Sequence, residues 1–314
     1  MVWIVTVPAI DDEAYLQFSH DQWASLRAAT PMTLSDDDVE QLRGSNVALT
    51  RDEVEQIYLP LARLLDLHMQ ATRQQSLVTE AFLGRPSTRV PYLIGIAGSV
   101  AVGKSTAARL LVELLGRWPH HPRVALVTTD GFLHPNAELE RRGLLDRKGF
   151  PASYDRRRLL AFVERLRSGA DEAWAPVYSH ITYDIVPDGH QHVVRPEIVV
   201  IEGLNVLQGN VGGPAVSDHF DFSIFIDASI DDIARWYVER FRIFRRTAFM
   251  QPDSYFRHYA DLSDAEADAE ARRLWRTINE VNLREHILPT RDRARLVLSK
   301  GPDHAVTHVR LRRR

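Results

Sequence analysis

The stretch YLIGIAGSVAVGKSTAARLL, from Tyr92 to Leu111, decides the fold of this 314-residue chain. It begins as an apolar run, breaks into small residues, reaches a single lysine and resumes with the spacing of a helix. Its centre, Gly98 to Ser105, fits the pattern G-x-x-x-x-G-K-[ST]. Such a pattern occurs by chance, but here it follows an apolar strand and opens a helix, which is the context that phosphate binding requires.

Phosphate binding is the chemistry expected of this loop. Glycines let backbone N–H groups turn toward a phosphate, and the following helix adds the positive end of its dipole. Lys104 would neutralise the β- and γ-phosphates of a nucleotide, and Ser105 would hold Mg²⁺. Only three of the 39 basic residues are lysines, so a lysine here marks a place where a compact ammonium must fit. The residues expected to bind the nucleotide are Gly98, Ser99, Val100, Ala101, Val102, Gly103, Lys104, Ser105 and Thr106.

Composition narrows the class of protein. Hydrophobic residues make up 45% of the chain and the net charge is −3, so no global basic field predicts a nucleic-acid partner. The absence of cysteine excludes disulfides, thiolate nucleophiles and cysteine metal sites, and is typical of a reducing compartment. The first residues show no signal peptide, and no uncharged apolar run approaches the ~18 residues that span a bilayer. A cytoplasmic protein without membrane contact is the expectation.

Hydrophobic periodicity predicts the organisation of the chain. Residues 1–89 are interpreted as a helical segment, with Ser35 and Thr50 as helix N-caps. Residues 90–314 alternate short apolar runs with helical patterns, which predicts an α/β domain with helices on both faces of a mostly parallel sheet. The expected strands are Tyr92–Ala97, Val124–Thr129, Ile198–Ile201, Phe222–Ile226 and Leu296–Ser299. The expected helices are Ser105–Leu115, Asp155–Arg167, Ile230–Ala248 and Asp264–Val281. The basic C-terminus is interpreted as a solvated tail.

Two carboxylates close apolar strands, Asp130 in VALVTTDGF and Glu202 in EIVVIEGLNVL. In an open parallel sheet the ligand crevice lies outside the carboxyl ends of the strands, so both acids should face the phosphate loop. Phosphoryl transfer needs a carboxylate to take the proton of an acceptor hydroxyl. We assign that role to Asp130 and place Glu202 on Mg²⁺ or its water, although the pattern alone allows the two roles to be exchanged.

The helix that follows Ser229 carries an aromatic stripe with an arginine in it. Tyr237, Arg240, Phe241 and Phe244 recur at steps of three and four, which places them on one face. A plain core stripe is the simple interpretation, but a buried unpaired guanidinium is expensive. The face is therefore predicted to line a cavity that holds an anion, with Arg240 stabilising a transferring phosphoryl group.

Across nearly its whole length the chain resembles the bacterial type I pantothenate kinases, within the phosphoribulokinase and uridine kinase group of P-loop kinases. The resemblance rests on blocks that include GSVAVGKST, TTDGFL, KGFPASYD, PVYSHITYDIVPDG, IEGLNVLQ, WYVERF, PDSYF and LSKGPDHAV. It implies a P-loop fold of three αβα layers, ATP and Mg²⁺ as cofactors, and phosphorylation of pantothenate to 4′-phosphopantothenate, the first step of coenzyme A biosynthesis.

The resemblance also implies roles for single residues. Asp130 acts as base on the primary hydroxyl of pantothenate, with Lys104 and Arg240 as its catalytic partners. The implied pantothenate pocket comprises Tyr178, His180, Tyr183, Tyr237, Arg240 and Asn282. The residues implied near adenine are Asn46, Lys300 and His304. The implied aromatic wall, which meets the apolar end of coenzyme A, comprises Phe241, Phe244, Tyr255 and Phe256. Lys148 is interpreted as a surface residue.

Regulation and assembly are likewise implied by the resemblance. Such kinases are feedback-inhibited by coenzyme A, which competes with ATP; the implied contacts are Lys104, Arg109, His180 and Phe244. They form homodimers.

The sequence can be weighed against three alternative functions. A uridine or sugar-phosphate kinase would share the loop and the Asp130 position and differ in the acceptor pocket. A GTPase switch should carry an N-K-x-D motif, and none of the three lysines stands in one. A motor ATPase would need a tandem or ring architecture, of which the sequence shows no sign.

Overall fold

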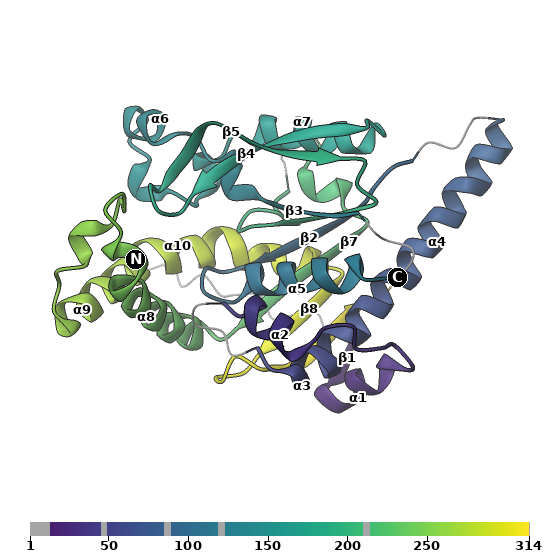
Figure 1. Cartoon of the computed structure of the whole chain (residues 1–314), viewed down its shortest axis with the longest axis horizontal. Coiled ribbons are helices and arrows are strands. Elements are labelled where there is room, and N and C mark those ends of the chain that lie inside the picture. The colour runs from purple at the N-terminus through teal and green to yellow at the C-terminus, as the bar shows by residue number, and fades with distance from the viewer. Residues whose placement is uncertain (1–12, 45–48, 85–88, 119–122, 210–213, 314) are drawn as a thin grey trace.

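A computed structural model describes residues 13–44, 49–84, 89–118, 123–209 and 214–313. Its centre is a seven-stranded sheet in the order β1-β9-β8-β7-β2-β6-β3 (Figure 1). The five strands from β8 to β3 are parallel to one another, whereas β9 pairs antiparallel with β8, and the edge strand β1 pairs antiparallel with β9. The strands are β1 Tyr15–Ser19, β2 Tyr92–Gly98, β3 Val124–Thr128, β6 Ile198–Glu202, β7 Phe222–Ala228, β8 Leu296–Lys300 and β9 Val306–Arg312. The predicted mostly parallel α/β fold and its five strands are confirmed.

Helices form where the sequence supplies caps and apolar stripes. Ser35 and Thr50 each accept a hydrogen bond from the backbone N–H three residues on, as predicted for N-caps. The four predicted core helices are confirmed, although the last continues through π-helical turns to Ile287. The helices are α1 His20–Ala24, α2 Asp36–Leu42, α3 Arg51–Glu53, α4 Leu59–Leu83, α5 Lys104–Gly116, α6 Asn136–Arg141, α7 Arg156–Arg167, α8 Ile230–Arg246, α9 Asp264–Leu274 and α10 Glu280–Asn282. In the described part of the chain no helix is both long and apolar enough to cross a bilayer.

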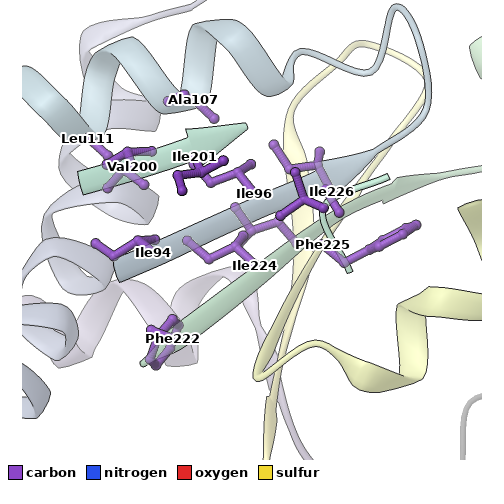
Figure 2. Packing of buried hydrophobic residues seen from close by; sticks show 14 of the residues in the cluster. Ile94, Ile96, Ala107, Leu111, Val200, Ile201, Phe222, Ile224, Phe225 and Ile226 are labelled. Carbon is purple, nitrogen blue, oxygen red and sulfur yellow. The ribbon is translucent and has the colours of Figure 1, made fainter. Parts of the chain in front are cut away.

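The core fixes the position of the phosphate loop. Every residue of β2 and β6 is buried, as expected for central strands covered on both faces. Ala107 and Leu111 of α5 pack over Val200 and Ile201 of β6 (Figure 2). Burying these side chains anchors the strand before the loop and the helix after it, so the loop between them is held at both ends.

Two strands at the sheet edge were missed. β1 lies in the N-terminal segment that was predicted to be helical, and it pairs with β9. β9 contains Arg310 and Arg312, two of the four arginines at the C-terminus, so the interpretation as a solvated tail was wrong for this part. Arg310 lies 3.4 Å from Asp227 of β7 and Arg312 donates to the carbonyl oxygen of Asp292. The strand pairing therefore ties the N- and C-terminal parts of the described chain together.

A second sheet consists of the antiparallel hairpin β4 Glu172–Ser179 and β5 Asp184–Val194. In Figure 1 it lies across the top of the molecule beside α6 and α7. The turn of this hairpin, residues 180–183, holds part of the YSHITY block singled out in the sequence.

Candidate active site

A cavity of about 260 Å³ lies at the carboxyl ends of the central parallel strands. The phosphate loop forms one wall, and Asp130, Glu202 and Arg240 face it from three other elements. Asp130 follows β3 and Glu202 ends β6, which are neighbouring parallel strands. The structure thus brings together the acids that strand ends alone predicted to share a crevice.

Backbone geometry explains the glycines of the loop. Gly98 has φ 145°, and a Cβ there would lie 2.5 Å from the carbonyl oxygen of Ile226. Gly103 has φ 97° and is the N-cap residue directly before α5. Both conformations favour glycine, since a side chain would be strained or would collide.

Lys104 is buried at the first position of α5, and its Nζ donates to the carbonyl oxygen of Ser99 at 2.7 Å. Burial lowers the pKa of Lys104, while the nearby carboxylates of Glu202 and Asp130 oppose that shift. The ammonium therefore lies inside the loop, next to the positive end of the helix dipole, as a phosphate-binding lysine should.

Ser105 and Glu202 form the polar pair suited to Mg²⁺. Ser105 Oγ donates to Glu202 Oε1 at 2.9 Å, and burial raises the pKa of Glu202. Among the described residues no cluster of three His, Cys, Asp or Glu side chains could hold a metal by itself. This donor set fits Mg²⁺, because that ion is usually held by one or two carboxylates together with substrate phosphates and waters.

Asp130 has two polar side-chain neighbours, one of which donates a hydrogen bond to it. Tyr154 Oη donates to Asp130 Oδ1 at 3.4 Å, and His180 Nε2 lies 3.9 Å from Asp130 Oδ2. Tyr154 is buried, so its hydroxyl is held in place. The sequence reasoning missed Tyr154; its only signal was its place in the KGFPASYD block.

A second cavity of about 560 Å³ adjoins the first and shares Asp130, His180, Arg240 and Phe244 with it. The predicted pocket residues that line it are Tyr178, His180, Tyr183, Tyr237, Arg240 and Asn282. They come from the β4–β5 hairpin, α8 and α10. Asp130 stands on the boundary between the two cavities, where a group could pass from one to the other.

The aromatic wall differs in part from the expectation. Phe241, Phe244 and Phe256 line the second cavity, but Tyr255 does not; its side chain is largely exposed and packs against the Tyr183 ring. Two further rings that line the cavity, Phe249 and Tyr259, were missed. Tyr255 was misplaced because neighbouring residues in an irregular segment point in different directions, which spacing does not reveal.

Arg240 lies in the stripe of α8 as predicted, partly buried among aromatic rings. Its guanidinium carbon lies 5.5 Å from the centre of the Phe244 ring. Burial lowers the pKa of Arg240, and within the described residues its guanidinium has no acidic ion-pair partner. An arginine that lines both cavities without such a partner is placed to receive an anion.

Asn282 and Lys148 both line the second cavity. Asn282 lies inside a continuous helical run that extends to Ile287. Its Nδ2 donates to the carbonyl oxygen of Gly149 at 2.9 Å, while its buried Oδ1 has no hydrogen-bond partner among the described residues. The interpretation of Lys148 as a surface residue was wrong: it is half-buried, and burial lowers its pKa to about 8.

The structure describes two of the three residues expected near adenine. Asn46 lies outside the described residues. Lys300 and His304 are buried together at the carboxyl end of β8, outside the linings of both cavities. His304 stacks on Trp236 with ring centres 4.0 Å apart.

We expect a His304→Phe variant to change how stability depends on pH. Burial, with Lys300 and Arg235 nearby, lowers the pKa of His304 from 6.5 to about 4. Between these values the unfolded chain binds a proton that the folded chain does not, so the folded state loses stability as pH falls. From pH 7 to pH 4.5 this amounts to roughly 2–3 kcal/mol. Urea unfolding at both pH values should show a smaller loss in His304→Phe, whereas the exposed His308→Phe variant should behave as wild type; equal losses in all three would contradict the assignment.

Comparisons with known proteins agree with this geometry. Residues 93–245 match the model of the Phosphoribulokinase / Uridine kinase family. A pantothenate kinase of Erwinia tasmaniensis is 54% identical over 95% of this chain and 96% of its own length. A pantothenate kinase of Escherichia coli O1:K1 is 53% identical over the same shares. The solved structure of YFH7 from Saccharomyces cerevisiae, described as a P-loop kinase with a circular permutation, matches with a TM-score of 0.51 at 12% identity, over 72% of this chain and 95% of that one, and supports the fold alone.

Proposed function

Because this chain belongs to the pantothenate kinase family of P-loop kinases, we propose that it transfers the γ-phosphoryl group of ATP to the primary hydroxyl of pantothenate. The products would be 4′-phosphopantothenate and ADP, the first step of coenzyme A biosynthesis. One observation carries the proposal: a phosphate cavity and an acceptor cavity meet at Asp130. Because the reaction consumes ATP, we place the protein in the cytoplasm.

The chain's own residues divide the chemistry between them. Asp130 takes the proton of the attacking hydroxyl, with Tyr154 fixing the direction of its carboxylate. Lys104 and Arg240 stabilise the charge on the transferring group from two sides. Ser105 and Glu202 would hold Mg²⁺, which would neutralise phosphate charge. The Ser105–Glu202 hydrogen bond favours Glu202 for the metal and leaves Asp130 as the base.

The acceptor cavity suits a substrate with both polar and apolar parts. Tyr178, Tyr183 and the unpartnered Asn282 Oδ1 offer hydrogen bonds, while the phenylalanine wall offers apolar contact. A phosphorylated sugar would instead need a second cluster of arginines, and Arg240 is the one arginine among the described residues that line this cavity.

ADP release tests the substrate. The purified protein is given Mg-ATP with pantothenate, uridine or ribulose 5-phosphate, each with and without coenzyme A. Turnover with pantothenate alone supports the proposal. Turnover with uridine or the sugar phosphate would keep the kinase chemistry and assign the other acceptor, and no turnover with any of them would reject all three substrates.

We also propose feedback inhibition by coenzyme A, competitive with ATP. The phosphate loop, Arg109, His180 and Phe244 line the first cavity, and Phe244 continues onto the aromatic wall. A ligand with phosphates at one end and an apolar arm at the other could occupy both cavities. In the ADP assay coenzyme A should raise the KM for ATP; a fall in kcat at unchanged KM would place the inhibitor elsewhere.

We propose that two copies of the chain form a homodimer through the outer end of α4. We also propose that each chain has two structural parts, residues 1–89 and residues 90–314. In Figure 1 this helix projects from the molecule. It exposes Val78, Leu83 and Phe82, the last with 88% of its surface accessible. A groove of about 640 Å³ runs beside it, and its lining mixes Met69, Leu77 and Val90 with polar and charged side chains. The exposed apolar end of α4 suits a reciprocal contact between two copies.

We expect Phe82→Glu to shift the protein from dimer to monomer, because a charge cannot be buried unpaired in an apolar interface. Light scattering after size exclusion measures the mass directly. Trp174→Glu, which changes an exposed aromatic residue on the distant hairpin, is the matched control and should leave the mass unchanged. A Phe82→Glu protein that remains dimeric would move the interface away from α4.

A further inference from the structure

The turn of the β4–β5 hairpin has a backbone conformation that needs support from outside. Tyr183 has φ 55°, in the left-handed region that residues with bulky side chains rarely adopt. Such a conformation is strained and persists where surrounding contacts impose it. The same turn carries His180 and Tyr183, two residues that line the acceptor cavity.

Asn136 supplies part of that support. It is the first residue of α6, and its side-chain Nδ2 donates to the carbonyl oxygen of Tyr183 at 3.0 Å. Its backbone N–H donates to Oδ1 of the next residue, Asp184, at 2.9 Å. Asn136 is absent from the lining of both cavities as the described residues define them, so it reaches a bound acceptor only through the turn.

Lys148 completes the network. Its Nζ donates to Asn136 Oδ1 at 2.6 Å and also to the carbonyl oxygen of Tyr183, which therefore accepts from two donors. The ammonium lies 4.1 Å from the centre of the Tyr183 ring and 4.9 Å from that of Tyr178. These are distances at which a cation is attracted to an aromatic face. Both the backbone and the ring of Tyr183 are thus held by the same side chain.

We propose that Asn136 and Lys148 form a latch that locks the β4–β5 turn with Tyr183 and His180 against the acceptor cavity. Asn136 acts as a positioning residue for acceptor binding, and Lys148, which itself lines the cavity, connects Asn136 to the turn. The inference rests on the proposed function only in taking this cavity as the acceptor site. Because the latch joins α6 and the loop before Gly149 to the hairpin, its loss frees the turn and leaves the phosphate loop intact.

The test is Asn136→Ala, which removes the donor to Tyr183 and the acceptor for Lys148 but keeps the backbone bond to Asp184. We expect kcat/KM for pantothenate to fall about tenfold, mainly through KM, with KM for ATP within twofold of wild type and the melting temperature nearly unchanged. Gln191→Ala is the matched control. Gln191 also ties the hairpin to the body through its amide, donating to the Leu126 carbonyl oxygen at 2.7 Å, but it lies away from the turn; its kcat/KM should stay at the wild-type value.

Repeating the substitution in a Tyr183→Gly protein distinguishes a positioning role of Asn136 from an effect on general stability. In a Tyr183→Gly protein the ring and the left-handed penalty are both gone, so adding Asn136→Ala should lower kcat/KM by less than a further twofold. A full tenfold loss in that background would overturn the latch, as would Asn136→Ala with kcat/KM within twofold of wild type. Should Asn136→Ala fold poorly, Asn136→Asp removes the donor to Tyr183 and keeps an acceptor for Lys148, so kcat/KM should fall by more than twofold but less than in Asn136→Ala.

Hydrogen–deuterium exchange tests the latch independently of which acceptor the enzyme phosphorylates. Amides of residues 180–184 should exchange faster in Asn136→Ala than in wild type or Gln191→Ala, whichever acceptor the enzyme uses. Unchanged exchange would reject the latch even if pantothenate is the substrate. Faster exchange in a protein that does not turn over pantothenate would support the latch and reject the proposed function.

Discussion

Asp130→Ala is expected to lower kcat with pantothenate about a thousandfold while nucleotide binding is largely kept. The carboxylate stands where the two cavities meet, and general-base catalysis contributes about 10²–10⁴ to rates of this kind. The phosphates are held by the loop and Lys104, which the substitution does not touch. Turnover is measured as ADP release and nucleotide affinity by fluorescence titration, with the exposed Asp37→Ala as control.

Metal dependence distinguishes Asp130 from Glu202. If Glu202 holds Mg²⁺, a Glu202→Ala protein should recover part of its rate as Mg²⁺ is raised, whereas Asp130→Ala should not. The opposite pattern would exchange the two roles. A rate for Asp130→Ala within tenfold of wild type would remove Asp130 as the base.

Arg240→Met is expected to lower kcat by about 10³, the lower end of what an arginine finger contributes. The substitution keeps the length of the side chain and removes the charge that faces both cavities. Because no acid pairs with this guanidinium among the described residues, the variant should be at least as stable as wild type. Activity and stability should therefore change in opposite directions.

Arg242→Met is the control on the same helix. Arg242 is paired with Asp268 on the exposed side of α8, so its loss should leave kcat unchanged. Kinetics and thermal unfolding of the two variants provide the comparison. Equal rates for Arg240→Met and wild type would make the stripe a structural feature only, and a marked loss of stability would mean that Arg240 has a buried partner.

Much of the fold was predicted from patterns formed by residues that are close together in the sequence. The phosphate loop was predicted because its strand, glycines, lysine and helix are contiguous between Tyr92 and Leu111. The five parallel strands were predicted because strands buried on both faces are continuous apolar runs. The stripe of α8 was predicted because helical spacing is regular, and the structure places Arg240 on the cavities.

Edge strands and pocket walls needed the tertiary structure. β1 and β9 are partly exposed and mix polar with apolar residues, so nothing in their composition separates them from loops. Tyr154 and Lys148 act on groups far along the chain, namely Asp130 and the carbonyl oxygen of Tyr183.

By itself the sequence determined the chemistry of the protein, because a phosphate loop and its helix dipole depend on neighbouring residues. Only the tertiary structure decided which side chains surround the acceptor and what holds them there. Those contacts join segments as distant as Gly149 and Asn282, and long-range packing creates a proximity that no periodicity in the chain records.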